Sequence, residues 1–484
     1  MVKKIVSGIM FVFLFVNFSM AANAGTLEKA MVKIITVSNA PDYLRPWQML
    51  GQYTTSGSGC IIEGNRILTN AHVISNATFI QVNKSGETTK YVAEILAVDH
   101  ECDLALLTVG DKSFFNNSTK IPIGGVPEPG EKVKVYGFPI GGDKLSVTEG
   151  VVSRIEIGQY SHSSRSFLTI QIDAAINQGN SGGPVLKDGK IIGVAFQSIE
   201  KAQNIGYAIP TVMIKHFLND LKDNDYKGFP TLGISTQGLE NEAYRKKLGM
   251  KKGQTGVIVR EIEYGSPSYG VLKAEDVILS INGVKIENDG TVPYGRSRID
   301  MSFITDLKYV GDRITIEVLR DKQPIKLNVV MKNYVPIIPR IEYDVKPVYY
   351  IFGGLVFTRL TINYIYSLWN QINSRPGILD RVVYEISTPE KQQIVVLQQV
   401  LADEVNKGYH DFSNLIVKKV NGETISDTAD LIKKIENAKG EFLEIELEDK
   451  NKITLETQKA KDAGNDILKK YGINYDRSED LRTQ

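Results

Sequence analysis

A serine stands among closely spaced glycines in the segment from Asp173 to Val185, which reads Asp-Ala-Ala-Ile-Asn-Gln-Gly-Asn-Ser-Gly-Gly-Pro-Val. A serine that attacks a carbonyl creates an oxyanion, which two backbone N–H groups aimed at one oxygen can stabilise. The turn that aligns them is strained for a residue with a Cβ atom, so Gly179 suits it. We predict Ser181 as a nucleophile and the N–H groups of Gly179 and Ser181 as its oxyanion hole. Taken alone, the segment could equally be a polar surface loop.

Two upstream segments supply a base and an acid. Ile67-Leu-Thr-Asn-Ala-His72-Val reads as a short apolar strand followed by a turn of small residues that carries a histidine. Cys102-Asp103-Leu-Ala-Leu-Leu places an aspartate just before another apolar strand. The chain order histidine, aspartate, serine is that of chymotrypsin-type proteases and differs from the order in subtilisins and α/β-hydrolases. We therefore predict His72 as the general base and Asp103 as the acid that orients it.

Other residues compete for these roles. Asp99 and Asp111 are rival acids, and we expect both in solvated turns. Gly182 and Gly183 are expected to let a substrate backbone approach without a side chain in the way. The rival bases are His100, His162, His216 and His410.

The three motifs together resemble the HtrA/Deg family of serine proteases, in which Thr-Asn-Ala-His-Val, Asp-Leu-Ala-Leu-Leu and Asp-Ala-Ala-Ile-Asn-x-Gly-Asn-Ser-Gly-Gly-Pro occur together. The likeness continues through residues 146–154 and 206–210 and so covers the protease region. One departure is Gln178, where a proline is common, and we expect it only to loosen the turn. The resemblance implies a serine endopeptidase that uses no metal and no other cofactor. The chain has no Walker-type loop, so proteolysis is expected to be independent of ATP.

The resemblance also implies a pocket and an assembly. Ile176, five residues before the nucleophile, would help line the primary specificity pocket and favour small or medium aliphatic side chains; plain core packing is the alternative. The aromatic segment 41–52, with Tyr43 and Trp47, would help to assemble trimers, or instead cover the edge of a barrel. We expect a homo-oligomer, either a trimer or a multiple of trimers.

The expected fold class is mainly β: a chymotrypsin-like double β-barrel protease followed by two PDZ-like α+β domains. Short apolar runs separated by Gly and Asp turns between residues 54 and 218 are typical of barrels. Residues 27–37 predict a first strand. Residues 210–222 predict a closing helix with Val212, Ile214, Phe217, Leu218 and Leu221 on its apolar side. The expected boundaries are 25–222 for the protease, 229–333 for the first PDZ domain and 340–472 for the second PDZ-like domain.

The first PDZ domain is recognised from Thr231-Leu-Gly-Ile234, which resembles the carboxylate-binding loop of PDZ domains. In such domains free N–H groups take a peptide C-terminus, and the adjoining strand edge adds the peptide as another strand. We assign peptide binding to Leu232, Gly233 and Ile234. Glu275 stands where the family usually has glycine, which cautions against assuming a standard turn there.

A weak internal repeat predicts the second domain. Residues 281–286 (Ile-Asn-Gly-Val-Lys-Ile) recur as residues 420–425 (Val-Asn-Gly-Glu-Thr-Ile), each followed by a helix-like and then a strand-like segment. Residues 352–357 (Phe-Gly-Gly-Leu-Val-Phe) would form its carboxylate loop. Thr388-Pro389 predicts the start of a helical insertion that ends near Asn406. A structural or assembly role is favoured for this domain over peptide capture.

Composition sets outer bounds on function. The 484 residues carry a formal net charge of +1, which argues against nucleic acid as a partner. Lys3-Lys4, an apolar run to Met20 and the small residues Ala22-Asn23-Ala24 predict a cleaved signal peptide over residues 1–24, with an uncleaved anchor as the alternative. No stable membrane span is expected, and export would place the protein in the periplasm of a Gram-negative cell or outside the cell. Cys60 and Cys102 either pair or remain as two small buried thiols.

These patterns favour an ATP-independent endopeptidase that degrades unfolded or damaged envelope proteins, with the PDZ domains presenting substrate, regulating or assembling the particle. Two alternatives remain. One is a peptide-binding holdase, which would not need Ser181. The other is an assembly scaffold with a resting active site.

Overall fold

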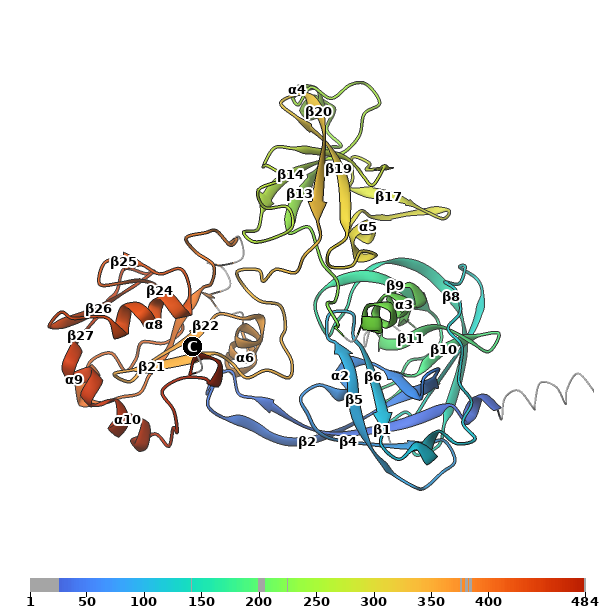
Figure 1. Ribbon diagram of the computed structural model, residues 1–484, viewed down its shortest axis with the longest axis horizontal. Helices are drawn as coiled ribbons and strands as arrows, with labels where there is room; N and C mark the ends of the chain where they lie inside the picture. The colour runs from blue at the N-terminus through green and yellow to red at the C-terminus, as the bar shows by residue number, and fades with distance from the viewer. Residues whose placement is uncertain are drawn as a thin grey trace, which may run out of the picture. The chain divides into compact units, whose positions relative to one another are not determined.

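The computed structural model describes residues 26–140, 142–198, 205–223, 225–374, 377–378, 382 and 385–482. The chain divides into two compact units (Figure 1): the chain up to Ser38 with Gln52–Gly228, and Asn39–Gly51 with Phe229–Gln484. The predicted signal peptide, residues 1–24, lies outside the described residues. Among the helices that are described, none has the length and apolar character needed to cross a membrane.

The first unit contains two closed six-stranded barrels, as expected. The order of the first is β1-β2-β3-β6-β5-β4, and that of the second is β10-β11-β12-β9-β8-β7. The strands of the first are β1 (Met31–Pro41), β2 (Met49–Ile62), β3 (Arg66–Thr69), β4 (Ala77–Lys84), β5 (Tyr91–Asp99) and β6 (Leu104–Val109). Those of the second are β7 (Lys132–Gly137), β8 (Ser146–Gln159), β9 (Ser166–Ile172), β10 (Pro184–Lys187), β11 (Lys190–Ser198) and β12 (Gly206–Pro210).

Helices in this unit are short. Helix α2 (Ala71–Ile74) follows β3, and 3-10 turns span Lys112–Phe115 and Leu221–Asp223. The predicted closing helix is α3 (Thr211–Asp220), which begins directly after Pro210. Its buried apolar residues are Met213, Ile214 and Phe217. Ile214 and Phe217 belong to the predicted apolar side, whereas Met213 does not.

The first PDZ domain is built on a sheet of order β13-β14-β15-β19-β20, with β16 paired to β15. Its strands are β13 (Ile234–Gly238), β14 (Val257–Ile262), β15 (Val277–Ile281), β16 (Val284–Lys285), β19 (Arg313–Arg320) and β20 (Gln323–Val330). The hairpin β17 (Thr291–Tyr294) and β18 (Ser297–Asp300) and the helices α4 (Glu242–Lys247) and α5 (Ser302–Asp306) complete it.

The second PDZ-like domain has a sheet of order β21-β22-β23-β24-β26-β27, with β25 paired to β24. Its strands are β21 (Tyr349–Phe352), β22 (Leu355–Arg359), β23 (Val395–Val400), β24 (Leu415–Val420), β25 (Glu423–Thr424), β26 (Phe442–Leu447) and β27 (Lys452–Glu456). Its helices are α6 (Ile362–Ile372), α8 (Thr428–Glu436), α9 (Thr457–Asp462) and α10 (Gly464–Lys470), with 3-10 turns at Glu404–Asn406 and Glu479–Leu481.

The internal repeat is confirmed by matching turns. Asn282-Gly283 joins β15 to β16 and Asn421-Gly422 joins β24 to β25, with positive φ at all four residues, as a type I′ hairpin requires. Each asparagine side chain also accepts a backbone N–H from the next long strand, Thr315 N–H at 2.9 Å and Glu444 N–H at 2.8 Å. The helices α5 and α8 then follow in corresponding places.

The helix predicted from Thr388 to Asn406 is wrong. This stretch instead holds the central strand β23, which pairs with β22 and β24. The β-branched run at residues 394–396 fits a buried strand, and pairing on both sides overrides the helix-start signal of Thr388-Pro389. The helix that does occur nearby is α6, whose N-cap Thr361 accepts a hydrogen bond from the N–H of Tyr364.

The aromatic segment between β1 and β2 packs in the second unit. Tyr43 is buried in a core with Leu360 and Tyr364, and its carbonyl accepts a hydrogen bond from Gln398 Nε2 at 2.8 Å. The ring of Trp47 lies edge-on to Tyr349, with centroids 6.0 Å apart. This packing against the second PDZ-like domain replaces the barrel-edge interpretation, while its role in trimer assembly stays a prediction.

Glu275 occupies a strained position. Its φ is +72°, a left-handed conformation that costs a residue with a Cβ roughly 1–2 kcal/mol. We expect Glu275→Gly to raise the free energy of unfolding by about 0.5–1 kcal/mol, because relief of this strain exceeds the entropy cost of the added glycine. Chemical denaturation followed by circular dichroism measures this change in the free energy of unfolding. The exposed ion pair of Glu275 with Arg260 contributes little, so the control Glu275→Gln should leave stability unchanged within about 0.5 kcal/mol.

Candidate active site and peptide-binding loop

The structure brings the predicted base and acid together. Strand β3 ends at Thr69, and the short helix α2 places His72 beside Asp103, which lies just before β6. His72 Nδ1 lies 2.7 Å from one carboxylate oxygen of Asp103, and the backbone N–H of His72 donates to the other at 2.8 Å. The carboxylate therefore fixes both the position of the histidine backbone and the direction of its ring.

Asp103 is itself held in an unusual conformation. Its side chain is 1% exposed, its φ is +54°, and its carbonyl accepts a hydrogen bond from Asn70 Nδ2 at 2.8 Å. Strained residues of this kind concentrate at functional sites. Burial opposes the charged carboxylate, but the charge and hydrogen bonds of His72, with a smaller effect from His162, outweigh it and lower the pKa of Asp103.

The electrostatics of His72 follow from the same contact. Its side chain is 31% exposed, so it is reachable from solvent. Desolvation disfavours the imidazolium, yet the charge of Asp103 and its hydrogen bond prevail and raise the pKa of His72. An imidazole with a raised pKa is a stronger base once it is neutral, as a general base must be.

One rival acid is placed differently from expectation. Asp99 is 5% exposed and not in a solvated turn. It accepts hydrogen bonds from the N–H groups of Glu101 and Cys102 and from the hydroxyl of Tyr226, so it shapes the loop that leads to Asp103. Burial and the neighbouring Glu101 raise the pKa of Asp99. Asp111 behaves as expected, because its exposed carboxylate caps the turn at Lys112–Phe115.

The glycines around Ser181 are required by the protein's own backbone. A Cβ atom at Gly182 would lie 2.1 Å from the carbonyl oxygen of Ser58, and one at Gly183 would lie 2.0 Å from that of Tyr136. The fold therefore requires both glycines for packing, while their role in admitting a substrate backbone stays a prediction. They let the Ser181 turn lie directly against the two barrels, and Ser58 N–H donates to the Ser181 carbonyl at 2.8 Å.

The predicted oxyanion hole has suitable local geometry. Gly179 has φ +96°, and a Cβ atom there would lie 2.4 Å from the carbonyl oxygen of Phe138. Within the described residues, no hydrogen bond takes up the N–H of Gly179 or of Ser181. Both donors remain available to an oxyanion.

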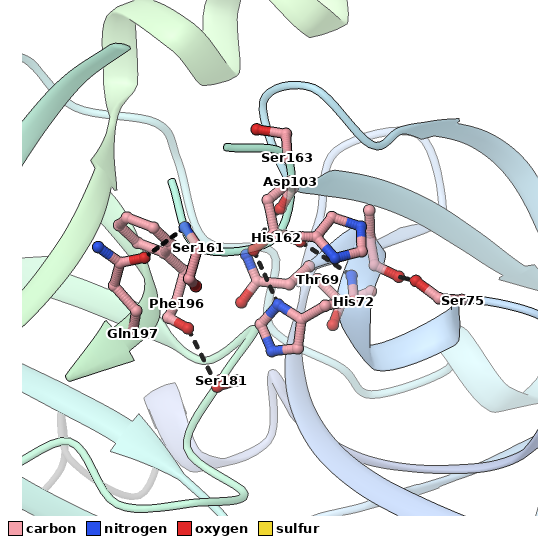
Figure 2. A network of polar contacts seen from close by, with 12 residues as sticks. Thr69, His72, Ser75, Asp103, Ser161, His162, Ser163, Ser181, Phe196 and Gln197 are labelled. Atoms are coloured by element: carbon pink, nitrogen blue, oxygen red, sulfur yellow. Dashed lines mark hydrogen bonds and ion pairs between the residues drawn. The ribbon is translucent and has the colours of Figure 1, made fainter. Parts of the chain in front are cut away.

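Ser181 and His72 face each other but are not hydrogen-bonded in this structure. Figure 2 shows the ring of His72 lying between Asp103 and Ser181. The Ser181 hydroxyl instead lies 3.5 Å from the carbonyl oxygen of Phe196. Catalytic hydrogen bonds are often long or poorly aligned until substrate binds, so this geometry is compatible with the predicted roles of both residues.

The remaining predicted residues of the protease are buried. Ile176 is 8% exposed in the core of the second barrel, where it packs closely on Gly206. Its role in a specificity pocket stays a prediction. Cys60 and Cys102 are buried free thiols, and burial raises the pKa of Cys60 to about 12. Among the described residues, no group of three or more His, Cys, Asp or Glu side chains is placed to hold a metal ion.

The loop predicted to bind peptide carboxylates has free donors. The carbonyl groups of Leu232 and Gly233 accept hydrogen bonds from the N–H groups of Ser268 and Glu263. No hydrogen bond within the described residues uses the N–H of Leu232 or Gly233. Ile234 begins β13. Among the described strands, β13 pairs only with β14, so one of its edges is open to a further strand.

The corresponding edge of the second PDZ-like domain is closed. Strand β22, the counterpart of β13, is covered by β21, and Gly353-Gly354 forms the tight turn between them. The predicted carboxylate loop at residues 352–357 is therefore a hairpin. The outer edge of β21 is covered in turn, because Ile351 N–H donates to the Asp476 carbonyl at 2.6 Å and Ser478 N–H to the Tyr349 carbonyl at 3.0 Å.

The sequence named one residue beside the site only as a rival base and did not predict its position. His162, from the loop between β8 and β9, lies with its ring centroid 6.0 Å from that of His72. Its segment carries none of the three motifs, and only the packing of the second barrel against the loop before Asp103 reveals its position.

Comparison with known protein families finds three regions. Residues 57–194 match the trypsin-like peptidase domain, and residues 230–331 and 338–480 each match a PDZ domain.

Curated relatives are similar along nearly the whole chain. Putative protease Do-like 3, mitochondrial, of Arabidopsis thaliana is 39% identical, with 94% of this chain and 80% of the relative covered. Protease Do-like 2, chloroplastic, of the same plant is 41% identical, with 93% and 75% covered. Among solved structures, the HtrA-type protease AlgW with a decapeptide is 25% identical with a TM-score of 0.51, covering 65% of this chain and 99% of that one.

Proposed function

Since the chain belongs to the HtrA/Deg family of serine proteases and is a serine endopeptidase with two PDZ domains, we propose that it cleaves unfolded or damaged envelope proteins with His72, Asp103 and Ser181 as its triad. The proposed triad is supported most directly by the two contacts of the Asp103 carboxylate with His72, one to its backbone N–H and one to its Nδ1. Asp103 lies on the side of the imidazole ring away from Ser181 (Figure 2).

In the proposed mechanism, neutral His72 takes the proton of the Ser181 hydroxyl as its oxygen attacks a peptide carbonyl. His72 then returns that proton to the leaving amine. Asp103 keeps the tautomer in which Nε2 is free to accept and stabilises the imidazolium that forms. The N–H groups of Gly179 and Ser181 bind the oxyanion, each lowering the barrier by about 3 kcal/mol.

The proposed mechanism requires a hydrogen bond between the Ser181 hydroxyl and His72. The Ser181 hydroxyl lies 3.5 Å from the Phe196 carbonyl oxygen and is not bonded to His72. We propose that a bound peptide turns this hydroxyl toward Nε2 by a change of the Ser181 χ1 rotamer.

We propose that the first PDZ domain captures peptide C-termini and that the second is structural. The free N–H groups of Leu232 and Gly233 and the open edge of β13 are what strand addition requires. In the second domain, β21 already occupies the equivalent edge of β22.

Peptide binding by the uncleaving Ser181→Ala chain tests this assignment. A decapeptide ending in valine should bind at one site per chain, and its C-terminal amide should bind at least tenfold more weakly because the carboxylate is lost. Gly233→Ala should weaken binding at least tenfold, since its Cβ would lie 2.3 Å from the Cβ of Ser266. The control Gly270→Ala also has a positive φ, +78° against +66° at Gly233, but its Cβ would meet nothing within 4 Å. Isothermal titration calorimetry measures the number of sites per chain and the affinity. Two sites per chain, or unchanged binding by Gly233→Ala, would contradict the assignment.

Export and assembly are further parts of the proposal. Residues 1–24 would direct export to the periplasm or outside the cell, although the two plant relatives carry mitochondrial and chloroplastic names. N-terminal sequencing of the exported protein should then begin at Gly25, and an intact N-terminus would contradict it. Light scattering after gel filtration should give a mass of three chains or a multiple of three.

The holdase alternative predicts the opposite dependence on Ser181. Reduced casein should be cut by the chain from Gly25 onward at the same rate with and without ATP, and the Ser181→Ala variant should leave it intact. If neither protein cuts casein but both suppress the aggregation of heat-unfolded citrate synthase, the holdase function replaces proteolysis. Equal cutting by both would mean that Ser181 is not the nucleophile.

A further inference from the structure

Three of the chain's five histidines meet beside Asp103. The ring centroid of His162 lies 6.0 Å from that of His72 and 5.2 Å from that of His100. His100 Nδ1 and His162 Nε2 are 2.9 Å apart, which is a hydrogen bond between two imidazoles. His162 is only 7% exposed, and Figure 2 shows it close to Asp103 and His72.

The two partners come from different barrels. His100 belongs to the turn between β5 and β6, just before Asp103, while His162 belongs to the loop between β8 and β9. The same two loops are joined by Ser163 Oγ, which donates to the Glu101 carbonyl at 2.8 Å, and by the ion pair of Arg165 with Glu101. The loop that carries His162 is therefore fastened to the loop that carries the catalytic acid.

A hydrogen bond between two imidazole nitrogens limits the charge of the pair. One nitrogen must carry a proton and the other a lone pair, so the bond survives with at most one positive charge on the two rings. A second proton would set two N–H groups against each other at 2.9 Å. It would also add a positive charge beside Asp103, where it opposes the imidazolium that His72 must become during the reaction.

Several titratable and charged groups lie around the pair. They are His72, Asp99, Glu101, Asp103, Arg165 and Tyr226. The Asp103 carboxylate is bonded to His72, Glu101 is paired with Arg165, and Asp99 is bonded to Tyr226. Burial keeps the nearby Cys102 thiol neutral by raising its pKa.

Resting on the proposed triad, we propose that His162 is a positioning residue for peptide hydrolysis. Its hydrogen bond with His100 holds the β8–β9 loop against Asp103 and His72, and a second protonation of the His100 and His162 pair breaks that hold and lowers activity. Acid therefore affects the reaction twice, once by protonating the base His72 and once through this pair.

The test is the dependence of kcat/KM on pH between 5 and 9, measured with a peptide substrate. For the unaltered chain, log kcat/KM should fall with a slope greater than one per pH unit over part of the acid range, because protonation of the pair adds its own loss of activity to the loss caused by protonation of His72. His162→Gln, which can still hydrogen-bond to His100 but does not titrate, should keep the high-pH rate within about threefold and show a slope of one. His162→Ala should lose about tenfold or more at high pH, because the bond to His100 is lost and only the contacts of Ser163 and Arg165 with Glu101 still join the two loops.

Controls separate this inference from the proposed function. His100→Gln should also reduce the slope to one, and His410→Gln, at an exposed site in the second PDZ-like domain, should change nothing. A slope that never exceeds one for the unaltered chain, or a slope above one retained by both glutamine variants, would overturn the role of His162. In either case Ser181→Ala would remain inactive if the triad is correct, whereas an active Ser181→Ala would refute the triad itself.

Discussion

Ser181→Ala is expected to lower kcat for peptide hydrolysis by about a millionfold, the size of effect seen when the nucleophile of a serine protease is removed. Without the hydroxyl no acyl-enzyme can form, and His72 has no proton to accept. The change removes one oxygen atom. Among the described residues, its only hydrogen-bond contact is the 3.5 Å approach to the Phe196 carbonyl oxygen, so the fold should be unaffected. Cleavage of a fluorogenic peptide measures the rate, and circular dichroism checks the fold.

A control substitution at another serine tests whether the loss of activity is specific to Ser181. Ser153→Ala removes an exposed hydroxyl from β8 in the same unit and should leave kcat within about twofold. A Ser181→Ala protein that retains more than about one thousandth of the rate would show that another residue provides the nucleophile, because binding and oxyanion stabilisation alone do not reach that level.

Asp103→Asn is expected to lower kcat by about ten-thousandfold. The amide would hold His72 in the wrong tautomer and could not stabilise the imidazolium. Asparagine tolerates positive φ better than most residues, so the backbone at φ +54° should be kept. The rate should fall at every pH, which steady-state kinetics with the same peptide will show.

The pH profile carries a second signature of Asp103. His72 works only when neutral, so activity is lost as the pH falls through its pKa. Asp103 raises the pKa of His72, and the loss should therefore move to lower pH in Asp103→Asn. The exposed cap Asp111→Asn should leave both rate and profile unchanged within about twofold. A shift to higher pH in Asp103→Asn would contradict the proposed electrostatics.

The residues proposed for catalysis were predictable because each occurs in a local pattern. A histidine after a short strand, an aspartate before a strand and a serine among glycines each place a side chain through the backbone immediately around it. The Asn-Gly turns at residues 282–283 and 421–422 were predictable for the same reason, since positive φ at two successive residues leaves few residue types.

What could not be predicted depends on distant partners. Asp99 looks like a turn residue until Tyr226, far along the chain, is found to cover it. The segment at 388–406 carries a helix-start signal but is a strand because β22 and β24 flank it. His162 reaches Asp103 only through the contact between barrels, which no local spacing encodes.

Dependence on distant partners also explains why the strand edges of the two PDZ domains differ. Both contain glycines where a carboxylate loop is expected, yet Gly233 precedes an open strand edge and Gly353-Gly354 turns a hairpin. The difference arises because residues 476–478, at the far end of the chain, help to hold β21 in place. An edge that is filled by the chain itself is not available to a peptide.

Covalent labelling of the nucleophile tests the central claim most directly. The chain from Gly25 onward is incubated with a fluorophosphonate while it digests reduced casein, and the labelled peptide is identified by mass spectrometry. We predict one label on Ser181, loss of casein cleavage in proportion to labelling, and no label in Ser181→Ala. Continued cleavage by protein without a label on Ser181, or a label on another residue that tracks the loss of activity, would contradict the proposed active site.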